Sequence, residues 1–74
     1  MNITIKLFAT FREGRFNIKE KQVPADTTVG QIVDELKIPV NELGIVLVNS
    51  RHVDTEQILK DGDTLSIFPL VGGG

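Results

Sequence analysis

The last eleven residues organise this chain; they read TLSIFPLVGGG, residues 64–74. Leu65 and Ile67 alternate with polar residues, which is the period-two pattern of a strand with one buried face. Phe68 is apolar but falls on the polar side of that alternation. Pro69 has no backbone N–H to donate, so we expect a strand over 64–68 and no regular pairing beyond it.

Two apolar residues and three glycines follow the proline: Leu70, Val71, Gly72, Gly73 and Gly74. A glycine run at the end of a chain is often a disordered end or a cloning scar. Here it directly follows a strand and a Phe-Pro-Leu-Val segment, which favours a functional tail. We therefore expect the domain to present this tail, with the α-carboxylate of Gly74 as the working group.

Size and charge restrict the class of protein. A chain of 74 residues makes one domain with a small core, so residues 1–74 are expected to form it, with a flexible tail over 69–74. No apolar run approaches the roughly 20 residues that span a bilayer, and no signal peptide precedes the first strand pattern. We therefore expect a cytoplasmic protein that binds no membrane. A net charge of −2 with scattered Lys and Arg argues against nucleic-acid binding.

The side chains offer no set of residues that would carry out catalysis or bind a metal. The absence of Cys excludes disulfides and thiolate chemistry. The one histidine, His52, cannot make a zinc site, and we expect it to be solvated or hydrogen-bonded. Phosphate-binding and nucleophile-elbow motifs are also missing. The sequence therefore predicts a protein that is not an enzyme by itself and binds no metal.

Outward from the closing strand, the pattern predicts further strands and one helix. Strands are expected over 2–8, 16–23, 45–48 and 51–53. Thr28 and Gln31 form a capping-box pattern for a helix that runs to about Lys37, ended by Pro39. Its apolar stripe is Val29, Ile32, Val33 and Leu36. Gly30 in its first turn indicates close packing of the helix on the sheet.

Three segments give more specific expectations. Phe16 and Ile18 are expected to face the core while Lys19 and Lys21 face solvent, with a bulge or an early strand end near Glu20, where the alternation breaks. The aliphatic run over 45–48 indicates a strand covered on both faces. The segment 55–59 is expected to make an irregular helical turn that places Ile58 and Leu59 in the core, before a turn at Gly62 that needs a positive φ.

This order of elements predicts a two-layer α+β domain with one helix packed on one face of a sheet. We expect the closing strand to lie beside the first strand, parallel to it, in the middle of the sheet. Phe8 and Phe68 both fall on the polar phase of their strands. They therefore predict an apolar patch beside the root of the tail, unless a loop or a second copy of the chain covers them.

The chain resembles the ubiquitin-like sulfur carriers, which are the small subunit of molybdopterin synthase and the thiamine-pathway sulfur carrier. The resemblance covers essentially all 74 residues, and these segments carry it: Ile5-Lys6-Leu7-Phe8-Ala9, Thr28-Val29-Gly30, Val48-Asn49, Lys60-Asp61-Gly62-Asp63 and Phe68-Pro69-Leu70-Val71-Gly72-Gly73-Gly74. It implies a two-layer β-grasp (ubiquitin-like) fold with a mixed sheet of four to five strands on one helix. Phe8-Ala9 and Phe68-Pro69 are more similar to the molybdopterin synthase subunit, whereas Leu70 replaces a proline usual there.

In proteins of this kind, a partner enzyme uses ATP to adenylate the C-terminal carboxylate, which is then converted to a thiocarboxylate that donates sulfur. The resemblance thus implies these partners: an E1-like adenylating enzyme, a sulfur donor protein, and the large subunit of molybdopterin synthase or a thiazole synthase. Gly73 and Gly74 take the place of the family's terminal pair, and Gly72 stands at the variable position before it. No cofactor is expected on the chain itself, because ATP belongs to the activating enzyme.

The resemblance also implies roles at the root of the tail. The partner-binding residues are expected to be Phe8, Phe68, Pro69, Leu70, Val71 and Gly72. Glycine has no Cβ, so the terminal pair can thread a narrow tunnel and expose its carbonyl to attack. Two other functions remain open: a protein modifier joined through its C-terminus to other proteins, and an interaction module with an inert tail.

Overall fold

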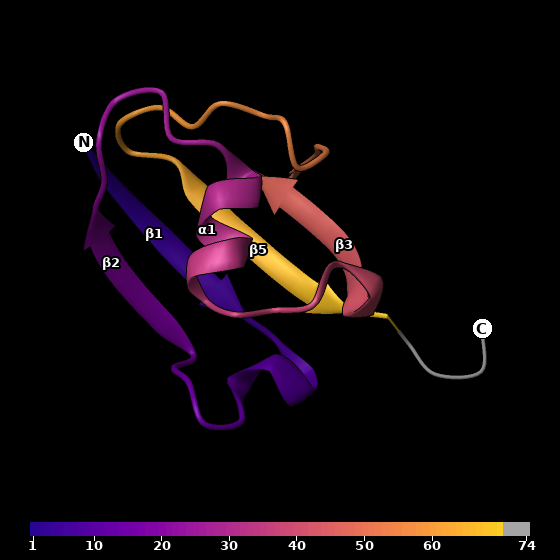
Figure 1. The fold of residues 1–74 in the computed structure, drawn as a ribbon. Coiled ribbons are helices and arrows are strands. Elements are labelled where there is room, and N and C mark those ends of the chain that lie inside the picture. Colours follow the sequence, from indigo (N-terminus) through magenta and orange to yellow (C-terminus); the bar gives the residue numbers. More distant parts are fainter. Residues whose placement is uncertain (71–74) are drawn as a thin grey trace.

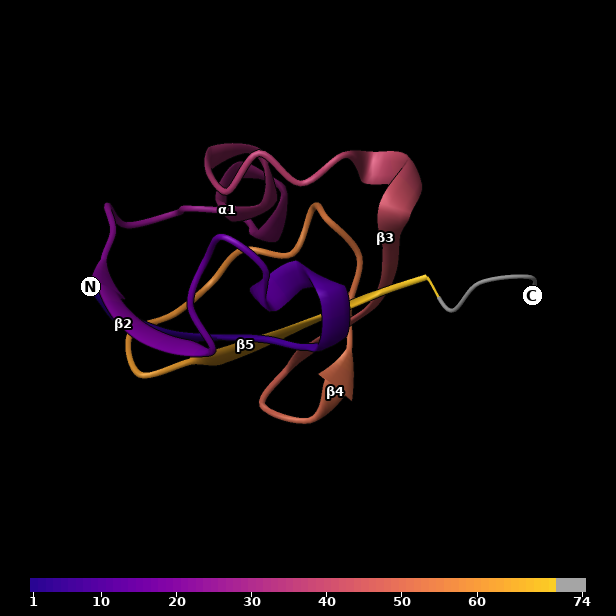
Figure 2. The ribbon, with the colours of Figure 1, turned by 90° about the horizontal axis from the view of Figure 1, so that it is seen from below.

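One helix crosses one face of a five-stranded sheet (Figure 1). A computed structural model describes residues 1–70. The strands are β1 (Asn2–Leu7), β2 (Ile18–Gln22), β3 (Leu43–Val48), β4 (Arg51–His52) and β5 (Thr64–Pro69). The helix is α1 (Val29–Glu35), and two short 3₁₀ turns are η1 (Ala9–Arg12) and η2 (Val40–Glu42). Figure 2 shows α1 as a layer separate from the sheet, which confirms the two-layer α+β arrangement.

The closing strand lies in the centre of the sheet, as expected. The strand order is β2-β1-β5-β3-β4. β5 runs parallel to β1, with Thr4 opposite Thr64 and Leu7 opposite Ile67. All other neighbours are antiparallel, so the sheet is mixed. The first and last strands of the described chain are therefore paired with each other at the centre of the sheet.

The core lies between α1 and the helix-facing side of the sheet. Its residues are Ile3, Ile5, Leu7, Phe11, Val23, Val29, Ile32, Val33, Ile38, Val46, Val48, Leu59, Leu65 and Ile67. Ile5, Leu7, Leu65 and Ile67 are completely inaccessible to solvent. The period-two patterns of the first and last strands therefore predicted the centre of the core correctly. Phe11, in η1, is a core residue that the strand patterns did not indicate.

Both ends of α1 are capped by local sequence. The Thr28 hydroxyl accepts from the Gln31 amide at 3.2 Å, and the Gln31 side chain accepts from the Thr28 amide at 2.8 Å, which confirms the capping box. At the other end, Lys37 adopts a φ of 59°, and the amide of Ile38 donates to the carbonyl of Val33. This is a Schellman arrangement. It ends the helix at Glu35, two residues before the predicted end and without help from the proline.

Gly30 permits a close contact, but the partner differs from the expected sheet. Its amide donates to the carbonyl of Thr55 at 2.8 Å. A Cβ at this position would lie 3.1 Å from that same oxygen. The small residue therefore brings the first turn of α1 against the segment after β4.

The side chains of β2 point to the opposite faces of the sheet from those predicted. Ile18 lies across from Lys6 on the outer face and is 62% exposed, whereas Lys19 and Lys21 lie across from Ile5 and Ile3 on the helix-facing side. Pairing is continuous through the strand, so the predicted bulge or early strand end near Glu20 is wrong. A bend before the strand resets the alternation, so Phe16 packs on the core while Ile18 does not.

Two further expectations are corrected. β3 buries Val46 and Val48 against the core but leaves Ile45 48% exposed, so it is covered on one face only. The segment 55–59 makes a turn and an isolated bridge between Thr28 and Ile58 in place of a helical turn. Leu59 is buried as predicted, whereas Ile58 is 49% exposed.

The turns follow the sequence signals. Asn49 and Ser50 both have positive φ and join β3 to β4 as a two-residue hairpin. Gly62 has a φ of 86° before β5, as predicted. Among residues 1–70, no helix has both the length and the apolar character that crossing a membrane would require.

We predict that Thr28→Ala lowers the free energy of unfolding by about 1 kcal/mol, because the amide of Gln31 loses its capping acceptor. Urea unfolding followed by circular dichroism measures this loss. Thr28→Ser keeps the hydroxyl and serves as the control, with stability close to that of the parent chain. Equal losses in both variants would contradict a capping role.

Candidate functional site

The site is the place where β5 leaves the sheet. Pro69 is the last residue of β5 and lies opposite Leu43, so the strand is one residue longer than predicted. The amide of Leu70 then donates to the carbonyl of Glu42 at 2.9 Å, which extends pairing one residue beyond the proline. Leu70 itself is 61% exposed. The predicted site residues Val71, Gly72, Gly73 and Gly74 lie outside the described residues.

Gly44 allows the backbone at the end of β5 to lie very close to β3. A Cβ at Gly44 would lie 2.4 Å from the carbonyl oxygen of Pro69 and 2.9 Å from the nitrogen of Leu70. Real side chains do not tolerate such distances to backbone atoms, and the register of β3 against β5 shifts at this point, between Leu43 and Val46. The sequence analysis did not single out Gly44, although a glycine at a strand often marks a close backbone approach.

Phe8 and Phe68 stack on each other beside this exit. Their ring centroids are 4.1 Å apart and the rings are within 9° of parallel. The amide of Phe8 donates to the carbonyl of Ile67, which continues the parallel pairing of β1 and β5 by one residue. The two phenylalanines thus share the outer face of adjacent strands, as predicted, and each is half-buried by the other.

Arg12 holds the stack from the side of η1. Its guanidinium carbon lies 5.4 Å from the centre of the Phe8 ring, a cation–π distance, and its Nε donates to the carbonyl of Leu7 at 2.8 Å. The sequence patterns did not indicate this contact. The contact fixes the ring of Phe8 without covering the whole stack.

A shallow apolar cleft lies on the other side of Phe68. It has a volume of about 320 Å³ and is lined by Ala9, Gly44, Ile45, Phe68, Pro69 and Leu70. None of these residues has an ionisable side chain. We call the cleft together with the Phe8–Phe68 stack the exit patch. Exposed apolar surface of this kind marks sites where other proteins bind.

The exit patch brings together four of the predicted site residues: Phe8, Phe68, Pro69 and Leu70. It adds Ala9, Gly44 and Ile45, which the sequence analysis missed. His52 is exposed on the outer strand β4, as expected for a solvated histidine. The lining of the cleft holds no nucleophile, acid or base, and its surface is apolar.

Solved structures of other proteins share this fold. The Haloferax volcanii HVO 2177 protein has 32% identity and a TM-score of 0.81, over 100% of this chain and 87% of that chain. A putative molybdopterin converting factor, subunit 1, from Pyrococcus furiosus has 26% identity and a TM-score of 0.78, over 96% and 99%. SAMP1 of Haloferax volcanii, a small archaeal modifier protein, has 28% identity and a TM-score of 0.76, over the whole of both chains. No curated protein matches the chain.

These likenesses confirm the ubiquitin-like β-grasp fold: one helix packed on a five-stranded mixed sheet. The class is that of the small ubiquitin-like carriers and modifiers. The family model of the ThiS family matches residues 5–74, and the chain belongs to that family. The resemblance inferred from the sequence is therefore correct at the level of the family.

We predict that Gly44→Ala destabilises the domain by about 1–3 kcal/mol, because its Cβ must displace the backbone of Pro69. The matched control is Gly30→Ala, whose Cβ is also tight but whose helix propensity improves by about 1 kcal/mol. Urea unfolding compares the two. A Gly44→Ala chain as stable as the Gly30→Ala chain would show that β5 does not need this close approach.

Proposed function

We propose that this protein is a sulfur carrier that acts through the carboxylate of Gly74. The observation that carries the proposal is the exit patch. A central strand whose residues Leu65 and Ile67 are fully buried ends beside an apolar, half-exposed surface that has no reactive side chain. Such a surface suits docking of an enzyme that acts on the residues that follow it. Membership of the ThiS family supports the same interpretation.

The chemistry needs two steps, both on the partner enzyme. A carboxylate oxygen of Gly74 attacks the α-phosphorus of ATP, and pyrophosphate leaves, which gives an acyl adenylate. Sulfur at the sulfide oxidation level, supplied by a donor protein, then attacks the carbonyl carbon, and AMP leaves. The product is a thiocarboxylate. Because Gly73 and Gly74 have no Cβ, neither face of that carbonyl is hindered.

This chain would provide recognition for those steps. Ordering the backbone of a tail on binding costs about 1–2 kcal/mol per residue. Contacts of the exit patch must offset that cost. Phe68 is the natural anchor, because aromatic residues at the centre of an interface contribute most of its binding energy. Phe8 and Leu70 widen the contact on either side.

Within this function, the molybdopterin pathway is the first choice. The likeness to the putative molybdopterin converting factor, subunit 1, supports it, as do Phe8-Ala9 and Phe68-Pro69. The partner would then be the large subunit of molybdopterin synthase. The thiamine pathway, with a thiazole synthase as partner, is the alternative; Leu70 and the ThiS family model favour it.

A second function is favoured by the likeness to SAMP1, the small archaeal modifier protein. In that case the adenylated C-terminus would be joined to amino groups of other proteins. Both functions share the first step and the same activating partner. They differ in whether sulfide or an amine displaces AMP.

The test of the main proposal is the intact mass of the chain after incubation with an E1-like adenylating enzyme, ATP and a sulfur source. We expect the mass increase that corresponds to replacing one oxygen by sulfur, and no change in a chain that lacks Gly74. The absence of this mass increase with an active enzyme would contradict the sulfur-carrier function. A ladder of conjugates in cell extract that disappears on deletion of Gly73 and Gly74 would favour the modifier.

We predict that Phe68→Ala raises the KM of the adenylating enzyme for this chain about tenfold, because loss of a central interface aromatic typically costs more than 1 kcal/mol of binding. ATP–pyrophosphate exchange at varied carrier concentration measures KM. The control is Ile58→Ala, which removes an apolar side chain that is 49% exposed but lies next to the start of α1.

Stability must be measured in parallel, because the Phe8–Phe68 stack is worth about 0.5–1.5 kcal/mol in aromatic contact beyond its buried area. A folded Phe68→Ala chain with an unchanged KM would contradict the docking role of the exit patch. Loss of the cooperative unfolding transition in that variant would show that Phe68 is a core residue.

A further inference from the structure

The β2 edge of the sheet carries a second candidate surface, separate from the exit patch. β2 is the outermost strand, with β1 as its one neighbour. The ladder bonds join Val23 with Met1 and Asn17 with Leu7. Because antiparallel pairs alternate between bonded and non-bonded positions, the amides and carbonyls of the intervening even-numbered residues point away from β1. Those residues are Ile18, Glu20 and Gln22.

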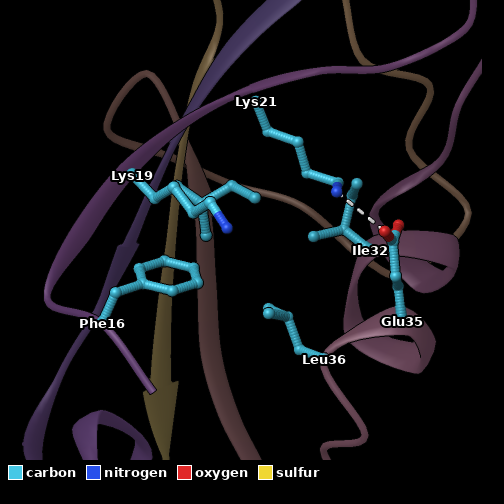
Figure 3. A pocket seen from close by; sticks show the side chains of 7 residues that line it. Phe16, Lys19, Lys21, Ile32, Glu35 and Leu36 are labelled. Atoms are coloured by element: carbon cyan, nitrogen blue, oxygen red, sulfur yellow. Dashed lines mark ion pairs between the residues drawn. The ribbon is translucent and has the colours of Figure 1, made fainter.

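A cleft lies beside this free edge, between β2 and α1 (Figure 3). Its volume is about 200 Å³, and its lining is Ile5, Phe16, Lys19, Lys21, Ile32, Glu35 and Leu36. This is smaller than the roughly 300–1,000 Å³ of small-molecule sites. The cleft therefore suits one apolar side chain of a protein segment better than a free ligand.

The rim of the cleft is positively charged, although the protein as a whole is acidic. Lys21 pairs with Glu35 at 2.8 Å, whereas Lys19 forms no ion pair within residues 1–70. The ammonium of Lys19 lies 5.6 Å from the Phe16 ring and is drawn toward the cleft in Figure 3. Arg15 lies next to this rim, since its Nε donates to the carbonyl of Leu36. The cleft and its rim thus carry three cations and one carboxylate, on a chain whose net charge is −2.

We propose that the β2 edge binds an extended, acidic segment of a partner protein, which adds to the sheet as a sixth strand. The outward amides and carbonyls of Ile18, Glu20 and Gln22 pair with its backbone, the mode of strand addition. One apolar side chain of the segment enters the cleft. An acidic side chain two positions away lies on the same face, opposite Lys19.

The segment is specified by the alternation of side chains along a strand. On the helix-facing side it needs an apolar residue flanked by Asp or Glu at every second position. On the outer side it meets Ile18, Glu20 and Gln22, which favours uncharged, β-branched residues. The synthetic peptide acetyl-Asp-Val-Ile-Thr-Glu-Val-amide meets these requirements. The same peptide with Asn and Gln in place of Asp and Glu is the matched control.

The test is a titration of the isotopically labelled full chain with each peptide, followed by amide chemical shifts. We expect the largest shifts, and slowed hydrogen exchange, at Ile18, Glu20 and Gln22. The neutral control peptide and the Lys19→Glu chain should each bind about tenfold more weakly, because charge complementarity at the rim is lost.

A pair of edge variants tests the backbone pairing directly. Glu20→Pro removes one outward amide and leaves the bonds to β1 intact, since proline is accepted on an edge whose N–H faces solvent. We expect this change to lower the affinity for the peptide about tenfold, while Glu20→Ala binds like the parent chain. Both variants should still be converted to the thiocarboxylate, because the exit patch is untouched. This separates failure of the edge proposal from failure of the proposed function.

Several results would overturn the proposal. They are no binding of the acidic peptide at millimolar concentration, shifts centred on Phe8 and Phe68, and equal affinity for the Glu20→Pro and Glu20→Ala chains. The amide spectrum of Glu20→Pro reports whether this variant is folded. If it is unfolded, the test rests on the affinity of the Lys19→Glu chain for the acidic peptide and on the affinity of the parent chain for the neutral peptide. If both affinities equal that of the parent chain for the acidic peptide, charge complementarity at the β2 edge is refuted.

Discussion

The parallel pairing of β1 and β5 is the constraint on which the rest of the molecule depends. It joins the first strand of the chain to the last and buries Ile5, Leu7, Leu65 and Ile67 completely. Parallel neighbours need a long crossover, and here everything between the two strands serves as that connection. α1 covers the resulting face. The end of the described chain is thereby anchored at the centre of the sheet, where its pairing continues to Leu70.

The two surfaces on this framework arise from different physical causes. The exit patch exists because β5 passes so close to β3 that position 44 has no room for a side chain, which leaves a hollow beside Pro69. The β2 edge exists because β2 has a neighbour on one side only and carries lysines where a core strand would carry aliphatic residues. Apolar contact therefore dominates the first surface, and backbone pairing with charge dominates the second.

Local patterns predicted the elements that are set by local rules. The capping box of α1, the alternation in β1 and β5, and the positive φ of Gly62 all follow from nearby residues. The sequence predictions fail where packing against other parts of the fold determines the structure. Lys19 and Lys21 lie with their alkyl stems along the helix-facing side of the sheet. Because a lysine can bury its stem while its ammonium stays in water, the polar character of these residues did not predict which side they face. The register shift at Gly44 depends on β3 and β5, which are far apart in sequence.

The central position of β5 also has a mechanical consequence. A partner that pulls on the C-terminal end, with the domain held near Met1, loads β1 and β5 along their common axis in opposite senses. The hydrogen bonds between them lie across that axis, so they resist as a group and cannot open one after another from an end. The parallel pair thus acts as a shear clamp. Force applied at the working end is borne by the most deeply buried strands of the domain.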